Sequence, residues 1–121
     1  FASQLINHEW VEPGDGRHEV YPAHGDVLDP AGHALVTAYA LRRPDGQWAV
    51  MLVNKDQENP HTVRIVFDDG ETKGERTFAG PVTFVSFGSE QYRWWPEATG
   101  GRADPDGPAS RSTLTGSAET V

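Results

Sequence analysis

The residues of this sequence with the clearest capacity for chemistry are histidines in its first third. His18, His24 and His33 lie close together along the chain, with Asp26 among them. Side chains of this kind bind zinc, copper or iron, so a small metal-dependent hydrolytic or oxidative enzyme is one hypothesis. Metal sites on strands often use histidines two residues apart, because both rings then leave one face. The sequence has no such pair. The alternative is exposed loop histidines, and we predict no metal or other cofactor.

Other catalytic patterns are missing from the sequence. Glycoside hydrolysis needs two carboxyl groups held on either side of a sugar, but most carboxylates here lie in turn-like segments, where aspartate is favoured for local hydrogen bonding. Ser89 lacks the Gly-x-Ser-x-Gly context of a hydrolase nucleophile, and no glycine-rich nucleotide loop occurs. We therefore predict no catalytic residue and a chain that is not an enzyme.

The aromatic stretch "QYRWW" is the second candidate site. Tyr92, Trp94 and Trp95 could stack on sugar rings, with Arg93 and Glu90 as hydrogen-bonding partners. On a strand, alternate residues leave opposite faces, so Tyr92 and Trp94 would share one face, and Arg93 and Trp95 the other. The cluster is predicted either to bind a carbohydrate or to cover an interface. For Trp48, by contrast, we expect a structural place, in the core or at an interface.

Strand signals dominate the segments that must position these side chains. The runs at 33–41 and 47–54 are rich in strand-forming residues, and Pro44-Asp45-Gly46 between them predicts a hairpin turn. Asp29-Pro30-Ala31-Gly32 predicts a second turn, and residues 3–10 fit either a strand or a helix. Further strands are expected within 18–22, 61–67, 75–80, 82–88 and 91–95. The sequence predicts an all-β fold with little helix: an antiparallel β-sandwich, immunoglobulin-like or jelly-roll-like, of seven or eight strands.

Composition divides the chain near Pro96. We predict a β-sandwich core over residues 1–96, followed by a segment at 97–121 rich in glycine, proline, serine and threonine. Such a composition is typical of linkers and tails, so this segment is expected to be partly docked or disordered. The chain starts "FASQL", without an initiator methionine, and we expect it to be a piece of a longer protein or a trimmed form.

Charge and composition narrow the range of partners. The 121 residues carry 18 acidic and 10 basic side chains, a net charge of −8, so no nucleic-acid partner is predicted. No apolar run approaches the roughly 20 residues that span a bilayer, so no membrane partner is predicted either. The absence of cysteine excludes disulfides and thiolate zinc sites.

Two long stretches resemble a known family. "VTAYALRRPDGQWAVMLVNKD" and "FGSEQYRWWPEATGGRADPDGPASRSTL" are similar to the C-terminal β-sandwich that follows the (β/α)-barrel in bacterial glycoside hydrolases similar to the family 39 β-xylosidases. The resemblance covers about residues 3–114, and its motifs are structural. The catalytic glutamates of the family lie on the barrel, so no catalytic residue is carried over. The resemblance implies a secreted protein, extracellular or periplasmic.

The resemblance leads to two further hypotheses beside the metal-dependent enzyme. In the first, the chain is a non-catalytic accessory module of a polysaccharide-degrading glycoside hydrolase, and carbohydrate binding to β-linked plant glycans uses the cluster at 90–95. In the second, the domain is purely structural and packs on the barrel domain of a parent hydrolase through the same aromatics. A domain separated from that partner would expose an apolar patch, so self-association is expected.

Overall fold

The structure is a computed structural model that describes residues 2–68, 76–105, 107–115 and 118–120. The chain forms two compact units, Phe1–Ile65 with Ala118–Val121, and Val66–Ser117. Apart from a short N-terminal helical segment, every element of the described part is an antiparallel strand. The predicted fold class, an antiparallel all-β fold with little helix, is confirmed, with nine strands in the described residues. No helix among those residues is long and apolar enough to cross a membrane.

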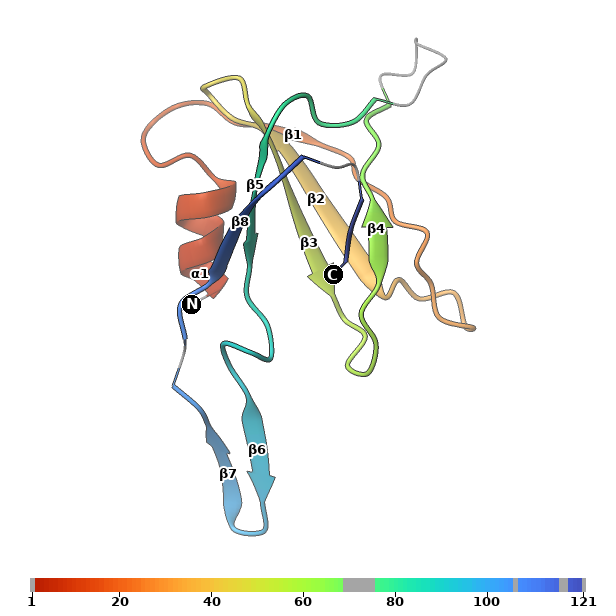
Figure 1. The fold of residues 1–121 in the computed structure, drawn as a ribbon, viewed down its shortest axis with the longest axis vertical. Coiled ribbons are helices and arrows are strands. Elements are labelled where there is room, and N and C mark those ends of the chain that lie inside the picture. The colour runs from red at the N-terminus through yellow and green to blue at the C-terminus, as the bar shows by residue number, and fades with distance from the viewer. Residues whose placement is uncertain (1, 69–75, 106, 116–117, 121) are drawn as a thin grey trace. The chain divides into compact units, whose positions relative to one another are not determined.

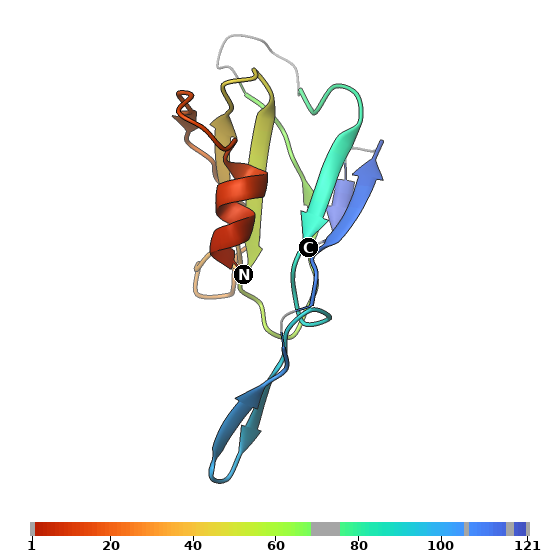
Figure 2. The ribbon, with the colours of Figure 1, turned by 90° about the vertical axis from the view of Figure 1, so that its left-hand side faces the viewer.

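The N-terminal segment, which fitted either a strand or a helix, is helical. α1 (Ala2–Leu5) continues into η1 (Ile6–Trp10), a π-helical turn closed by a 2.9 Å hydrogen bond from the Val11 N–H to the Ile6 carbonyl. Its half-buried side chains recur at helical spacing: Leu5, Ile6, Glu9 and Trp10. η1 contacts β3 (Trp48–Asn54), and the helical segment lies beside that strand (Figure 2). A helix in this place covers a sheet edge that would otherwise be open to pairing.

The first unit is built on a three-stranded sheet of order β1-β2-β3 (Figure 1). β1 (Glu19–Tyr21) and β2 (Val36–Arg42) pair antiparallel, and β2 and β3 pair over all seven residues of each strand. The predicted turn between β2 and β3 is confirmed. Gly46 has a φ of 83°, and the Gln47 N–H donates to the Asp45 carboxylate at 2.9 Å. The second predicted turn is also present, since the Gly32 N–H donates to the Asp29 carbonyl at 3.0 Å.

Very few side chains in the described part of the chain are fully buried. Val36 and Leu41 are the two apolar residues in this class, and their spacing along β2 places them on opposite faces of the sheet. Both faces are therefore partly covered at different points. Of the two places expected for Trp48, the core is excluded, because the residue remains 37% exposed at the start of β3.

The predicted tail contributes three strands. β9 (Ala118–Thr120) pairs with β4 (Thr62–Arg64) in the first unit. In the second unit, β8 (Ser110–Leu114) pairs with β5 (Val82–Ser86). Also in the second unit, β7 (Gly100–Ala103) pairs with β6 (Trp94–Glu97). Strand pairing thus continues well beyond Pro96. The strand expected within 75–80 is reduced, in the described part, to a bridge between Phe67 and Arg76.

The turn after β3 is held by one carboxylate. Asp56 Oδ1 accepts the backbone N–H groups of Glu58 at 3.0 Å and Asn59 at 3.1 Å, and Asp56 Oδ2 lies 2.8 Å from Nε2 of His61. The backbone hydrogen bond from Glu58, followed by the bond with His61, lowers the pKa of Asp56 to about 2. The ionised carboxylate is therefore the form that holds this turn.

Replacement of Asp56 by Asn should make the first unit less stable at pH 5, because the amide accepts these bonds without a charge. The folded pKa of Asp56 lies below its unfolded value of 3.8, so its contribution is present above pH 3.8 and is lost as the pH falls toward about 2. We expect the difference in melting temperature between wild type and Asp56→Asn to shrink over that interval. Asp26→Asn, at an exposed position, is the matched control. A difference that stays constant from pH 5 to pH 2 would contradict this account.

Candidate functional site

The two tryptophans of the predicted aromatic cluster lie on a β-hairpin of the second unit. β6 (Trp94–Glu97) pairs with β7 (Gly100–Ala103), and Gly100 at the turn has a φ of 128° (Figure 1). Trp94 lies opposite Ala103, and Trp95 lies opposite Arg102. Because successive residues of a strand leave opposite faces, the two tryptophans point to opposite sides of the hairpin. The predicted alternation is confirmed for this pair.

One face of the hairpin is organised around Trp95. Its indole N–H donates to Asp104 Oδ2 at 2.9 Å, and the ring is half-buried. The guanidinium carbon of Arg93 lies 4.1 Å from the ring centroid, and that of Arg102 lies 5.8 Å from it. A guanidinium over an indole is attracted by the negative face of the ring. Arg93 and Trp95 are therefore brought together as predicted, on one face.

Ion pairs complete this Trp95 face. Arg102 donates from Nε to Glu97 Oε1 at 3.1 Å and from Nη1 to Asp104 Oδ1 at 3.4 Å. These exposed pairs contribute little individually. The pair with Asp104 involves the same carboxylate that accepts the indole N–H of Trp95. A ring covered by a guanidinium offers less open surface to a sugar. The contact between Trp95 and Arg93 therefore serves to stabilise the hairpin.

The opposite face presents Trp94. Its side chain is 55% exposed, and its ring lies against Gly101 of β7, where a Cβ atom would overlap the indole. Gly101 occupies the position diagonal to Trp94 on the neighbouring strand, so the missing side chain leaves room for the ring to lie over the backbone. Trp94 is thus held at its base and open on the outer side.

Pro96 lies between the two tryptophan-bearing positions and the turn. Pro96 is opposite Gly101. The Asp104 N–H donates to the Arg93 carbonyl at 2.9 Å, so residues 93 and 104 form a hydrogen-bonded pair. Hydrogen-bonded and non-hydrogen-bonded pairs alternate along an antiparallel ladder, which makes Pro96 and Gly101 a non-hydrogen-bonded pair. In such an alternating ladder, the nitrogen of residue 96 points away from β7. Proline is tolerated here because no ladder donor is lost.

Tyr92 and Glu90 lie outside the hairpin, in the turn before it. The Tyr92 N–H donates to the Gly88 carbonyl at 3.0 Å, and β6 begins only at Trp94, so strand alternation does not set the face of Tyr92. Its side chain is 40% exposed. Glu90 is exposed, and within the described residues it makes no hydrogen bond or ion pair. Both are available to a ligand near Trp94.

Gln91, in the turn before β6, is bonded to the chain that follows β7. Its side-chain Nε2 donates to Ser110 Oγ at 3.0 Å, and its backbone carbonyl accepts the Gly107 N–H at 2.7 Å. These two bonds join the segments before β6 and after β7.

Three residues of the hairpin, Gly101, Arg102 and Asp104, were not predicted from the sequence, because their segment was assigned to a tail. The signal was "ATGG", a turn-forming stretch that predicts a hairpin partner for "WWPE".

The histidine candidates are not brought together. His18 accepts the Glu12 N–H on Nε2 at 3.0 Å, and its Nδ1 lies 3.1 Å from the Gly16 carbonyl, so both ring nitrogens are used by the backbone. His33 Nδ1 lies 3.0 Å from Asp29 Oδ2, and the pKa of Asp29 is lowered, chiefly by the backbone N–H of His33. His24 is exposed. In the described part of the chain, no group of three or more histidine or acidic side chains could hold a metal.

Substitution of Gly101 by Ala should displace the indole of Trp94, because the added methyl group would occupy the space of the ring. The four tryptophans give four indole N–H signals in a nitrogen-15 correlation spectrum, and Trp94→Phe identifies one of them. We expect Gly101→Ala to shift that signal and to leave the Trp10 and Trp48 signals in place. Gly88→Ala is the control, since a Cβ there meets open space. An unmoved Trp94 signal would show that the ring does not lie on Gly101.

Comparison of the chain with protein-family models, with curated proteins and with solved structures gives no match. The family resemblance therefore remains an expectation from the sequence.

Proposed function

We propose that the chain is a non-catalytic module that binds β-linked glycans through Trp94, as an accessory part of a polysaccharide-degrading glycoside hydrolase. The observation that carries the proposal is the position of Trp94, whose indole is 55% exposed while its base rests on Gly101. A large aromatic ring held on a paired strand and open to solvent offers a flat apolar surface that a ligand or a partner can cover.

The chemistry of β-linked glycans suits such a ring. The C–H groups on one face of a pyranose are apolar and stack on an indole, while the hydroxyls at its rim need donors and acceptors. Tyr92 offers a hydroxyl and Glu90 offers a carboxylate in the adjoining turn, and both are exposed. On the other face of the hairpin, Arg93 and Trp95 keep the strand in place. The proposal therefore assigns contact to Trp94, Tyr92 and Glu90, and support to Trp95 and Arg93.

Attachment to a hydrolase rests on the resemblance to the family 39 β-xylosidases. It implies a barrel domain as the partner and an extracellular or periplasmic location. The described residues supply no catalytic constellation that argues for an activity of their own. Binding would act by holding the catalytic domain close to an insoluble substrate, which raises the effective concentration of that substrate.

Trp94→Ala should reduce retention on insoluble cellulose or xylan, because the stacking surface is removed while the contacts of Trp95 remain. A loss of about tenfold in affinity, ~1.4 kcal/mol, is expected for one aromatic contact. Trp94→Phe should retain part of the binding, since a smaller ring still stacks. Pull-down on the polymers and calorimetry with soluble oligosaccharides measure the effect.

Val66→Ala provides the control for loss of an exposed apolar side chain in the same unit. The proposal fails if Trp94→Ala is retained as well as wild type, with its fold verified by circular dichroism.

A structural role is the second candidate, and one surface of the first unit favours it. Val20, Tyr39 and Val53 are all exposed. Val20 is opposite Leu41, and Val53 is opposite Thr37. Thr37, Tyr39 and Leu41 lie on one face of β2, because alternate residues of a strand share a face, so Val20, Tyr39 and Val53 share that face of the sheet. An exposed apolar face of this kind is typical of a domain that packs on another, here the barrel of a parent hydrolase.

If this face is a docking surface, the isolated chain should self-associate. Sedimentation velocity should then show an apparent mass that rises with protein concentration. Val20→Lys, at a position 76% exposed, should suppress the association without loss of melting temperature. A monomer at all concentrations would count against the structural role and would leave the glycan proposal in place.

A further inference from the structure

A second surface of the first unit combines aromatic and polar groups. Glu19 of β1, Arg42 of β2 and Trp48 of β3 are aligned across the three strands, so they share one face of the sheet. Tyr21 lies on the same face, two residues beyond Glu19, with its ring centroid 4.7 Å from that of Trp48. The two rings are tilted by 58°, and each keeps more than a third of its side chain exposed. This surface is called the Trp48 face.

The polar groups of the Trp48 face are held in place. The Tyr21 hydroxyl donates to Glu19 Oε2 at 3.0 Å, and this bond raises the pKa of Tyr21 above its ordinary value of 10.0. The phenol therefore stays protonated at neutral pH. Glu19 lies opposite Arg42, but no ion pair joins them within the described residues. One carboxylate and one guanidinium thus stand side by side on paired strands, each with hydrogen-bonding capacity to spare.

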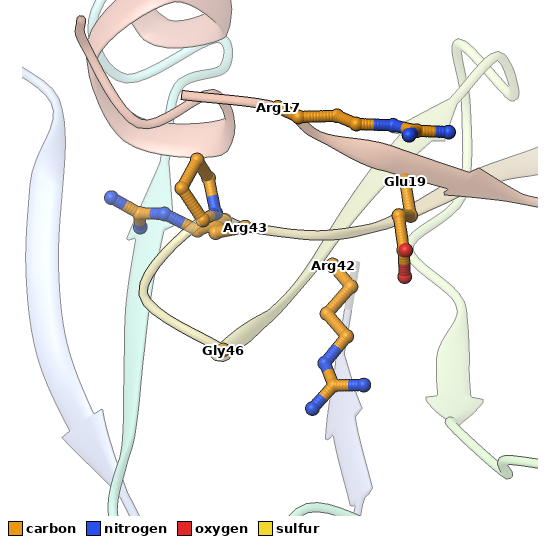
Figure 3. A pocket seen from close by; sticks show the side chains of 6 residues that line it. Arg17, Glu19, Arg42, Arg43 and Gly46 are labelled. Carbon is orange, nitrogen blue, oxygen red and sulfur yellow. The ribbon is translucent and has the colours of Figure 1, made fainter. Parts of the chain in front are cut away.

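A pocket adjoins these two side chains at the turn between β2 and β3 (Figure 3). It is lined by Arg17, Glu19, Arg42, Arg43, Pro44 and Gly46. Figure 3 shows Arg17 on the other side of the β1 ribbon from Glu19, and Arg43 directed away from both. Arg43 is also engaged elsewhere, because its Nη1 donates to the Glu9 carbonyl at 3.5 Å and its Nε lies 3.9 Å from Asp45 Oδ2.

The polar chemistry of the Trp48 face, beside this pocket, follows from Glu19 and Arg42. Glu19 supplies acceptors and Arg42 supplies donors, so the charges of this pair cancel. An anionic ligand would be attracted to Arg42 and repelled by Glu19. A cationic ligand would be attracted to Glu19 and repelled by Arg42. A neutral ligand with adjacent hydroxyls satisfies both, because each hydroxyl donates to the carboxylate or accepts from the guanidinium. Beside the exposed rings of Tyr21 and Trp48, this is the recognition chemistry of a neutral sugar.

We propose that the Trp48 face is a second sugar-binding site, separate from Trp94, which takes a neutral pyranose of a glycan. Trp48 and Tyr21 contact the apolar face of the ring, while Glu19 and Arg42 bind its hydroxyls. Two sites on one chain would raise the avidity for a polysaccharide above the affinity of either site. The residues of this site lie within the first unit, and those of the Trp94 site within the second.

Indole N–H signals report each site independently in the full chain. During titration with cellohexaose or xylohexaose, we expect the Trp48 signal to shift in the wild type and also in Trp94→Ala. Arg42→Gln should weaken the response at Trp48 by about tenfold and leave the Trp94 response unchanged. Glu19→Gln should also weaken it. Arg17→Gln is the matched control and should have no effect, because the Arg17 side chain lies on the other side of the β1 ribbon from Glu19.

The possible outcomes separate the two proposals. If the Trp94 signal responds and the Trp48 signal does not, the second site is wrong and the first stands. The reverse result overturns the Trp94 site and supports this one. No response at either signal overturns both. A normal response in Arg42→Gln, or tighter binding of an oligogalacturonate at Trp48, overturns the pairing of Glu19 with Arg42 as the basis for a neutral ligand.

Discussion

The scarcity of buried side chains is the constraint on which the rest of this structure depends. With Val36 and Leu41 as the fully buried apolar residues of the described part, there is no deep core to position distant segments. Order is instead local: strands are fixed by their neighbours, and turns are fixed by side chains such as Asp45 and Asp56. The seven-residue pairing of β2 with β3 is the longest ladder, and the first unit is built around it.

The same constraint explains how the β6–β7 hairpin is organised. A two-stranded hairpin is marginally stable alone, so one of its faces must supply contacts that a core would otherwise give. Trp95 does so by joining Arg93, Arg102 and Asp104 in one cluster. That arrangement leaves Trp94 free of a supporting role. The different surroundings of the two adjacent tryptophans thus follow from the alternation of side chains along a strand.

Much of the strand framework could be predicted from the sequence, because its signals are local. The β2–β3 hairpin was predicted from Pro44-Asp45-Gly46 and two apolar runs, and the opposite orientation of Trp94 and Trp95 from simple alternation. The sequence left open whether residues 3–10 are helical, since eight residues are too few for periodicity to separate a helix from a strand.

The partners of the site were harder to predict, since they depend on pairing between segments. Polar and glycine-rich composition indicated a tail after Pro96, yet Gly101 and Asp104 form the base of both tryptophan positions. Trp48 does not lie in the core, because its position opposite Arg42, at the start of β3, leaves it at the surface. The pairing register between strands places Gly101 and Asp104 beside the two tryptophans and Trp48 at the surface, and no local sequence pattern reveals that register here.

Pro96 has a consequence for solubility. A hairpin that displays a bare indole beside an unpaired strand edge would be a template for the addition of further strands from other molecules. At the outward-facing position of β6, proline offers no N–H group to an incoming strand and introduces a ring in its path. The hairpin can therefore keep the exposed indole of Trp94 while its outer edge resists the addition of further strands.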